Sequence, residues 1–104
     1  MAVHDFSNLY AQYPSIIAAM PNPFTSHQFI LELARQNQTL YIEALYSYRH
    51  HTHRDSPAPF LIVHGILAQQ LLEFPNLVRQ LRRNLPSQNI FGEDDPCSEW
   101  VKVK

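Results

Sequence analysis

Eight prolines divide this chain of 104 residues, and their positions limit where helices can run more than any other feature of the sequence. Proline lacks a backbone N–H and clashes with the preceding turn, so a helix accepts it in the first turn and otherwise ends at it. The segment Pro21-Asn22-Pro23 therefore separates an N-terminal stretch from the rest. Further along the chain, Pro59, Pro75 and Pro86 delimit two segments of helical length.

Apolar residues at three- and four-residue intervals predict a helix in each long segment. Between Phe29 and Tyr48 no Gly or Pro interrupts this pattern, and Thr25 or Ser26 is a good N-cap, so one long helix is expected at about 26–49. The run from Pro59 is apolar on more than one face, which predicts a central, buried helix. The third helix, at about 75–85, carries an apolar stripe formed by Leu77, Val78, Leu81 and Leu85.

The two ends of the chain give weaker patterns. Residues 1–23 are expected to form an irregular helical arm that packs on the domain or on a second copy, with Pro14 opening its second short turn. After residue 86, period-2 alternation over Glu99–Lys104 predicts a β-strand. We expect this strand to form a β-hairpin with Ile90 and Phe91 across a Gly-Glu-Asp-Asp-Pro turn.

Length and composition favour one small domain, and residues 24–104 are assigned to it. A near-neutral net charge of −1 with 45% hydrophobic residues excludes intrinsic disorder. The single Cys97 excludes a disulfide framework and a zinc site built on several thiolates, and two glycines are too few for a Walker or Rossmann phosphate loop. With no signal-peptide pattern and no long apolar run, a cytoplasmic protein without a membrane partner is expected.

Residues 64–83 resemble a helix-turn-helix. Ala68 fits the small residue at which the second helix crosses the first, and Val78 and Leu81 would anchor the second helix from beneath. The corner Leu72-Glu73-Phe74 departs from the pattern, because such corners often carry Gly. Together with the predicted hairpin, the pattern resembles the winged helix-turn-helix superfamily over about 25–104. This implies a mainly α fold, a small helical bundle with a C-terminal β-hairpin.

The outward face of the predicted helix 75–85 carries the residue types that read DNA. Arg pairs bidentately with guanine, and Asn or Gln with adenine. No acid lies between Glu73 and Glu93, and lysines on the wing could reach phosphates. The predicted DNA contacts are Asn76, Arg79, Gln80, Arg82, Arg83, Lys102 and Lys104.

The leading hypothesis is a small protein that binds duplex DNA, as transcriptional regulators do. Because one recognition helix gives modest affinity, a homodimer is expected, with the arm and the long helix as its contact surface. An arginine-rich face is also typical of a solvated surface, so a helical module that holds a protein partner remains the alternative. A pI near 6.6 limits the expectation to one basic face and salt-sensitive binding.

No enzymatic chemistry, cofactor or metal is expected. His50, His51 and His53 with Asp55 have metal-binding side chains, but neighbouring side chains in a loop diverge, so we interpret them as a solvated loop. Cys97 lies in the acidic turn Asp94-Asp95-Pro96-Cys97-Ser98-Glu99, where carboxylates raise a thiol pKa and disfavour a nucleophile. The serines show no His-Asp partner in the sequence.

Overall fold

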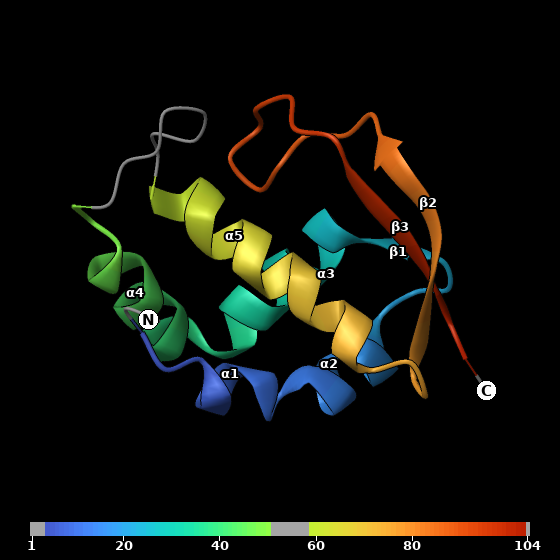
Figure 1. Cartoon of the computed structure of the whole chain (residues 1–104), viewed down its shortest axis with the longest axis horizontal. Helices are drawn as coiled ribbons and strands as arrows, with labels where there is room; N and C mark the ends of the chain where they lie inside the picture. Colours follow the sequence, from blue (N-terminus) through green and yellow to red (C-terminus); the bar gives the residue numbers. More distant parts are fainter. Residues whose placement is uncertain (1–3, 51–58, 104) are drawn as a thin grey trace.

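The structure is a computed structural model, and it describes residues 4–50 and 59–103. The described chain folds into five α-helices, one 3₁₀ helix and a three-stranded antiparallel sheet (Figure 1). In chain order the elements are α1 (Ser7–Tyr10), α2 (Tyr13–Ala19), β1 (Phe24–Thr25), α3 (Ser26–Gln36), α4 (Gln38–Ser47), α5 (Pro59–Gln70), η1 (Leu71–Glu73), β2 (Val78–Leu85) and β3 (Cys97–Lys102).

The N-terminal arm packs on the rest of the domain. Pro14 lies in the first turn of α2, as the sequence predicts, and Leu9, Tyr13 and Ile16 are buried in the common core. The Tyr13 hydroxyl donates a hydrogen bond of 2.6 Å to the backbone oxygen of Leu67 in α5. Much of the apolar surface of the arm is therefore covered within one copy, whereas Ile42 and Tyr46 of the segment expected to form the long helix are exposed.

The expected long helix at 26–49 is two helices. Thr25 caps α3 as predicted: its side chain accepts from the Gln28 N–H, and the Gln28 side chain accepts from the Thr25 N–H. At Asn37 the backbone leaves the helical region (φ −136°, ψ 52°), and the Asn37 side chain donates to the Leu33 oxygen instead. An Asn side chain can thus replace the backbone donor and end a helix without Gly or Pro.

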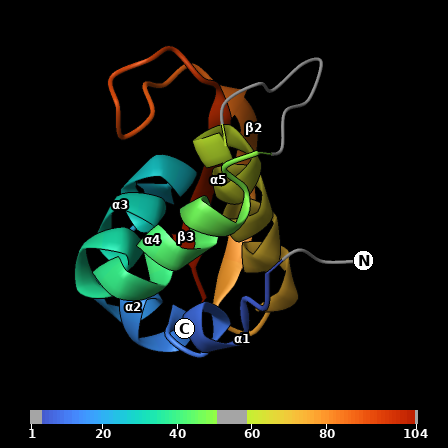
Figure 2. The ribbon, with the colours of Figure 1, turned by 90° about the vertical axis from the view of Figure 1, so that its left-hand side faces the viewer.

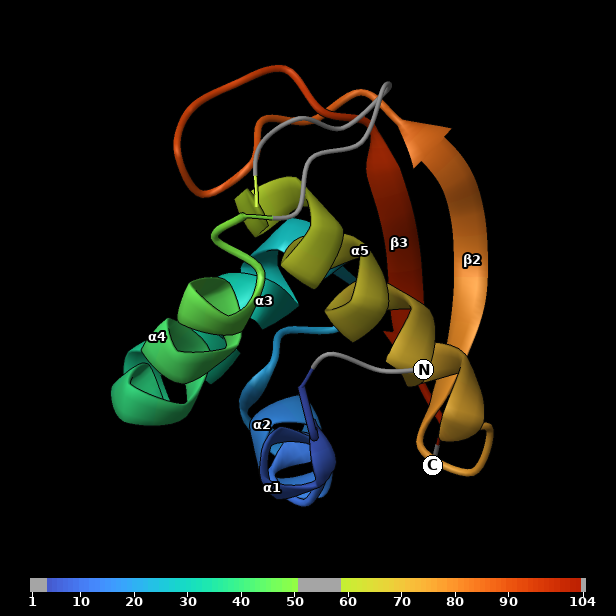
Figure 3. The same ribbon diagram turned by 60° about the vertical axis from the view of Figure 1, so that its left-hand side comes forward.

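Helix α5 is central, as predicted, but it is not buried on every face. Val63, His64 and Leu67 are buried, whereas Gly65 and Gln69 are exposed. Figure 3 shows α5 between the sheet and α4. After η1 the helical segment ends before Pro75.

The predicted recognition helix at 75–85 is wrong: this segment forms strand β2. Its partner along the whole length is β3, which also pairs with β1, so the strand order is β1-β3-β2. The helix-turn-helix interpretation of residues 64–83 is therefore corrected as well. A strand at Cys97–Lys102 agrees with the sequence, but its hairpin partner is β2 and not Ile90-Phe91.

The long connection between β2 and β3, residues 86–96, folds back toward the helices. Phe91 stacks on His64 of α5 with ring centroids 6.0 Å apart and meets Phe60 edge-on at 4.5 Å. Asn89, buried, accepts backbone N–H bonds from Phe91 and Glu93 and so shapes the turn. Figure 2 shows this connection on the side of α3, away from the edge of β2.

None of the helices in residues 4–50 and 59–103 is both long enough and apolar enough to cross a membrane.

Candidate functional site

Four of the predicted DNA contacts lie on one edge strand, and three of them are arginines. Arg79, Arg82 and Arg83 are all exposed on β2, which has β3 on one side and no strand of the described sheet on the other. Arg82 pairs with Glu99 of β3 (Nε to Oε1, 2.8 Å), and Arg83 Nε donates to Gln80 Oε1 at 3.2 Å. We call β2 with these three side chains the arginine strand.

The remaining predicted contacts are less well placed. Asn76 is exposed in the turn before β2, whereas the Gln80 amide donates to Ser98 Oγ at 2.7 Å. Lys102 Nζ donates to the oxygens of Ala18 (3.2 Å) and Met20 (2.8 Å), so it caps the end of α2. Lys104 lies outside the described residues.

The acidic residues near the sheet are separated from the arginine strand. Glu93, Asp94 and Asp95 lie in the connection 86–96, which bends over α5 (Figure 1). Within the described chain, Glu99 is the one carboxylate that forms an ion pair with the arginine strand. A basic edge and an acidic loop therefore occupy different parts of the same hairpin.

A hydrogen bond fixes a histidine in the interior of α5. His64 is 4% exposed, and its Nε2 lies 2.6 Å from the hydroxyl of the buried Tyr41. Burial lowers the pKa of His64 to about 4, with a further decrease from His27 and an opposing effect of Asp95. Burial also raises the pKa of Tyr41 to about 12. At neutral pH this pair is uncharged, as an apolar interior requires.

The structure also brings together a serine, a histidine and an aspartate that are far apart in the sequence. The hydroxyl of Ser87 lies 2.9 Å from Nδ1 of His27, and Asp95 Oδ2 lies 3.5 Å from Nε2 of the same ring. His27, 8% exposed, stands at the start of α3, so the contacts fasten both ends of the connection 86–96 to that helix. These residue types occur in hydrolase triads. The sequence holds no signal for this grouping, because its members are separated by up to 68 positions and no motif surrounds them.

The described residues contain no group of three or more His, Cys, Asp or Glu side chains placed to hold a metal ion. Of the histidine cluster, His50 is exposed at the end of α4, and His51, His53 and Asp55 lie outside the described residues.

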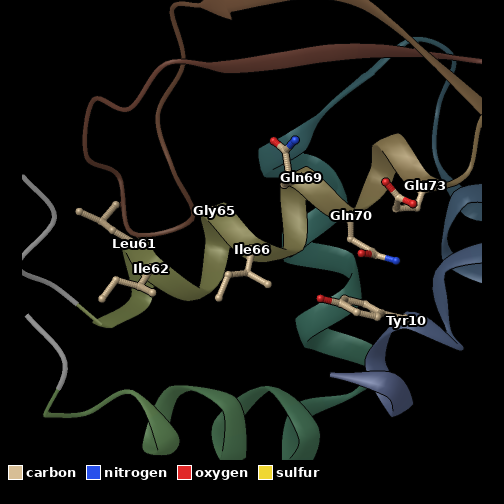
Figure 4. A pocket seen from close by; sticks show the side chains of 8 residues that line it. All are labelled: Tyr10, Leu61, Ile62, Gly65, Ile66, Gln69, Gln70 and Glu73. Carbon is tan, nitrogen blue, oxygen red and sulfur yellow. The ribbon is translucent and has the colours of Figure 1, made fainter. Parts of the chain in front are cut away.

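Helix α5 borders a groove of about 760 Å³ (Figure 4). Figure 4 shows Ile62, Ile66 and Gln70 of α5 on the side of the helix that faces Tyr10 of α1. From Pro59 to Gln70 the helix contains no Asp, Glu, Lys or Arg. Its exposed face is thus uncharged, in contrast to the arginine strand.

Comparison with models of known protein families found no match, and searches of curated proteins and of solved structures found no significant match either. The fold and the two surfaces are therefore the basis for a functional proposal.

Proposed function

We propose that this protein is a small non-enzymatic protein of the winged-helix type that binds duplex DNA through the arginine strand. The observation that carries the proposal is the exposure of Arg79, Arg82 and Arg83 on one edge strand that contains no acidic residue.

The order of the elements supports the winged-helix comparison. Strand β1 lies between two helices, α2 and α3, and the last two strands form a hairpin after the final helices. The last strand, β3, is the middle strand of the sheet. This resembles a winged helix, in which the hairpin is the wing, and α5 then takes the place of the helix that precedes the wing.

The electrostatics of the wing favour a polyanion. Arg79 and Arg83 form no ion pair among the described residues, so no carboxylate there neutralises either guanidinium group, and the hydrogen bond of Arg83 Nε to Gln80 leaves its other N–H groups for a phosphate. Arg82 can do so in addition, because its side chain is 60% exposed despite its pairing with Glu99. Guanidinium groups match phosphate geometry well, and each phosphate contact adds about 0.9 to the slope of log affinity against log salt concentration.

The proposal differs from the sequence-based hypothesis in the element that meets DNA. Helix α5 contains no charged residue that could attract the duplex, and the acidic connection 86–96 lies beside it. We therefore propose contact with the DNA backbone by the wing, with weak sequence preference, in place of major-groove reading by a basic helix.

Salt-dependent binding of a short fluorescent duplex, measured by anisotropy, tests this proposal. The variant Arg79→Ala/Arg83→Ala should reduce the slope of log affinity against log salt by about 1.8, two phosphate contacts, and weaken binding at low salt. Arg82 is left in place because it pairs with Glu99 across the sheet.

The matched control is Arg35→Ala/Arg49→Ala, which removes the same charge from α3 and the end of α4, away from the wing. It should retain the wild-type slope. Absence of duplex binding at low salt would contradict the proposal, and so would an equal reduction of the slope in both double variants.

A second function, a module for protein interaction, is favoured by the uncharged exposed face of α5. Since charged residues are depleted at the centre of protein interfaces, such a face suits a protein better than a nucleic acid.

A further inference from the structure

A polar hollow of about 310 Å³ lies between the arginine strand and the C-terminal end of α5. The end of α5, the 3₁₀ helix η1 and both strands of the hairpin contribute to its walls. We call this hollow the Arg83 pocket, and its described lining residues include no Asp or Glu. They are Gln69, Leu72, Gln80, Arg83, Asn84, Cys97 and Ser98.

A chain of hydrogen bonds orients Arg83 in this pocket. The Gln80 amide donates to Ser98 Oγ at 2.7 Å, and Arg83 Nε donates to Gln80 Oε1 at 3.2 Å. Gln80 is thus held by β3 and in turn holds the guanidinium group. Because this side chain is already ordered, less conformational entropy is lost when its terminal N–H groups bind a ligand.

Several hydrogen-bond donors of the pocket have no acceptor. The terminal N–H groups of Arg83 and the amides of Gln69 and Asn84 meet none among the residues that the structure describes. The Ser98 hydroxyl accepts from Gln80, so its own hydrogen can be donated as well. Donors from a helix and from two strands therefore surround one hollow.

A register shift of β2 brings two of these donors to the same pocket. In a regular strand, successive side chains such as those of Arg83 and Asn84 point to opposite faces of the sheet. Here the pairing with β3 slips between Arg82 and Leu85, and the Asn84 backbone has a φ of 53°. As a result both residues line the pocket, as expected of a bulge, which can redirect a side chain.

We propose that the Arg83 pocket binds one phosphate group. A phosphate accepts hydrogen bonds from several directions, and this suits donors on three elements better than a planar carboxylate does. Glu99 follows Ser98 in β3, so its side chain points to the opposite face of the sheet, where it pairs with Arg82. The positive charge of Arg83 is therefore left for the ligand.

Two sources of phosphate share this chemistry, the backbone of DNA and a free phosphate ion or ester. As a contact for DNA the pocket rests on the proposed function, and it then identifies Arg83 as the arginine that holds a phosphate in a built site. Binding of free phosphate does not depend on that function. The two sources are distinguished by separate measurements.

Titration of the full chain with inorganic phosphate, followed by amide NMR shifts, tests the pocket without DNA. The shifts of Asn84 and Ser98 should exceed those produced by sodium chloride at equal ionic strength. Gln69→Glu places a carboxylate in the pocket and should weaken phosphate binding about tenfold by charge repulsion. Asn84→Gly keeps the backbone conformation, removes one donor and should also weaken binding about tenfold.

The matched control is Gln70→Glu, the same change one position further along α5. Figure 4 shows that Gln69 and Gln70 leave the helix in different directions, and Gln70 lines the groove beside Tyr10 and not the Arg83 pocket. Both glutamates have the same effect on net charge and lie in the last turn of the helix. Gln70→Glu should therefore retain wild-type phosphate binding, and urea unfolding should confirm that both variants are folded.

Fluorescence anisotropy with the short duplex then identifies the source. If DNA supplies the phosphate, Gln69→Glu should lower the slope of log affinity against log salt by about 0.9, one phosphate contact, while Gln70→Glu retains it. If the slopes of both variants equal that of wild type, or if no duplex binds at all, the phosphate responses at Asn84 and Ser98 assign the pocket to a free phosphate group.

The proposal is overturned if phosphate shifts Asn84 and Ser98 no more than chloride does. It is also overturned if Gln69→Glu and Gln70→Glu bind phosphate equally well. Loss of duplex binding with an intact phosphate response contradicts DNA binding by the arginine strand but supports the pocket, so the two proposals can fail separately.

Discussion

His64 should make the stability of this protein fall between neutral pH and about pH 4. The ring is buried, its Nε2 meets the hydroxyl of Tyr41, and its Nδ1 is buried without a hydrogen-bond partner. Protonation would place a positive charge in this environment, so burial lowers the pKa of His64 from 6.5 to about 4.

The magnitude follows from the two pKa values. In the unfolded chain the imidazole takes up a proton as the pH falls through about 6.5, whereas in the folded protein it does so only near the lowered value of about 4. Between these values the unfolded state binds more protons, and the free energy of unfolding decreases by up to about 1.4 kcal/mol per pH unit. The total loss from this residue is about 3 kcal/mol, complete below the folded pKa and absent above the unfolded one.

Urea unfolding at a series of pH values, compared between wild type and His64→Leu, measures this contribution. His64→Leu should lose about 3 kcal/mol less than wild type from neutral pH to about pH 4. Since the single variant leaves the Tyr41 hydroxyl unpaired, Tyr41→Phe/His64→Leu provides a second comparison in which both partners are removed. His50→Gln, at an exposed site, should follow wild type. Parallel pH profiles for wild type and both His64 variants would refute the reasoning.

Two further predictions concern local structure. Thr25→Ala removes half of the capping box on α3 and should cost about 1 kcal/mol, seen as a melting temperature lower by roughly 4–8 °C, with Ser15→Ala as a control outside the cap. Asn84 has φ 53° at a register shift of β2, so Asn84→Gly should be tolerated and Asn84→Val should cost about 1–2 kcal/mol in urea unfolding. An equal response to Gly and Val would show that this backbone conformation is not retained in solution.

Strand β2 was predicted as a helix for an identifiable physical reason. Its pairing with β3 slips by one residue between Gln80 and Arg82 and again between Arg82 and Leu85. Val78, Leu81 and Leu85 fall at intervals of three and four as in a helix, but the extra residues interrupt the alternation of the strand and these three do not form one buried stripe. Leu81 is in fact 50% exposed, and pairing with β3 outweighs the helix propensity of Arg, Gln and Leu.

The elements set by local chemistry were predicted more accurately. Pro14, the Thr25 cap, Pro59 and Pro75 each mark a boundary where the sequence places one. The break at Asn37 was missed because it depends on one side-chain hydrogen bond and on no Gly or Pro. Proline positions and capping residues therefore predicted most helix ends, but they did not identify a strand with register shifts.

The sequence predicted which residues belong to the candidate site, but not how the fold arranges their side chains. A stretch without acids identified Arg79, Arg82 and Arg83, and these three residues do share one exposed element. Lys102 was assigned to a phosphate, although its ammonium group caps α2 across 82 positions of sequence. Contacts of this separation, like those of His27 with Ser87 and Asp95, depend on the whole fold and leave no local pattern.

Residues 78–85 form a strand where a helix was expected, and this changes the DNA sequence specificity that the protein can have. A helix in the major groove presents several side chains to base edges, whereas an edge strand presents its arginines along the edge of the sheet. Arg79 and Arg83 are four residues apart, and the register shift between Gln80 and Arg82 keeps their separation along the strand below the roughly 13 Å of a regular strand. One copy can thus hold about two or three phosphates, too few for tight binding.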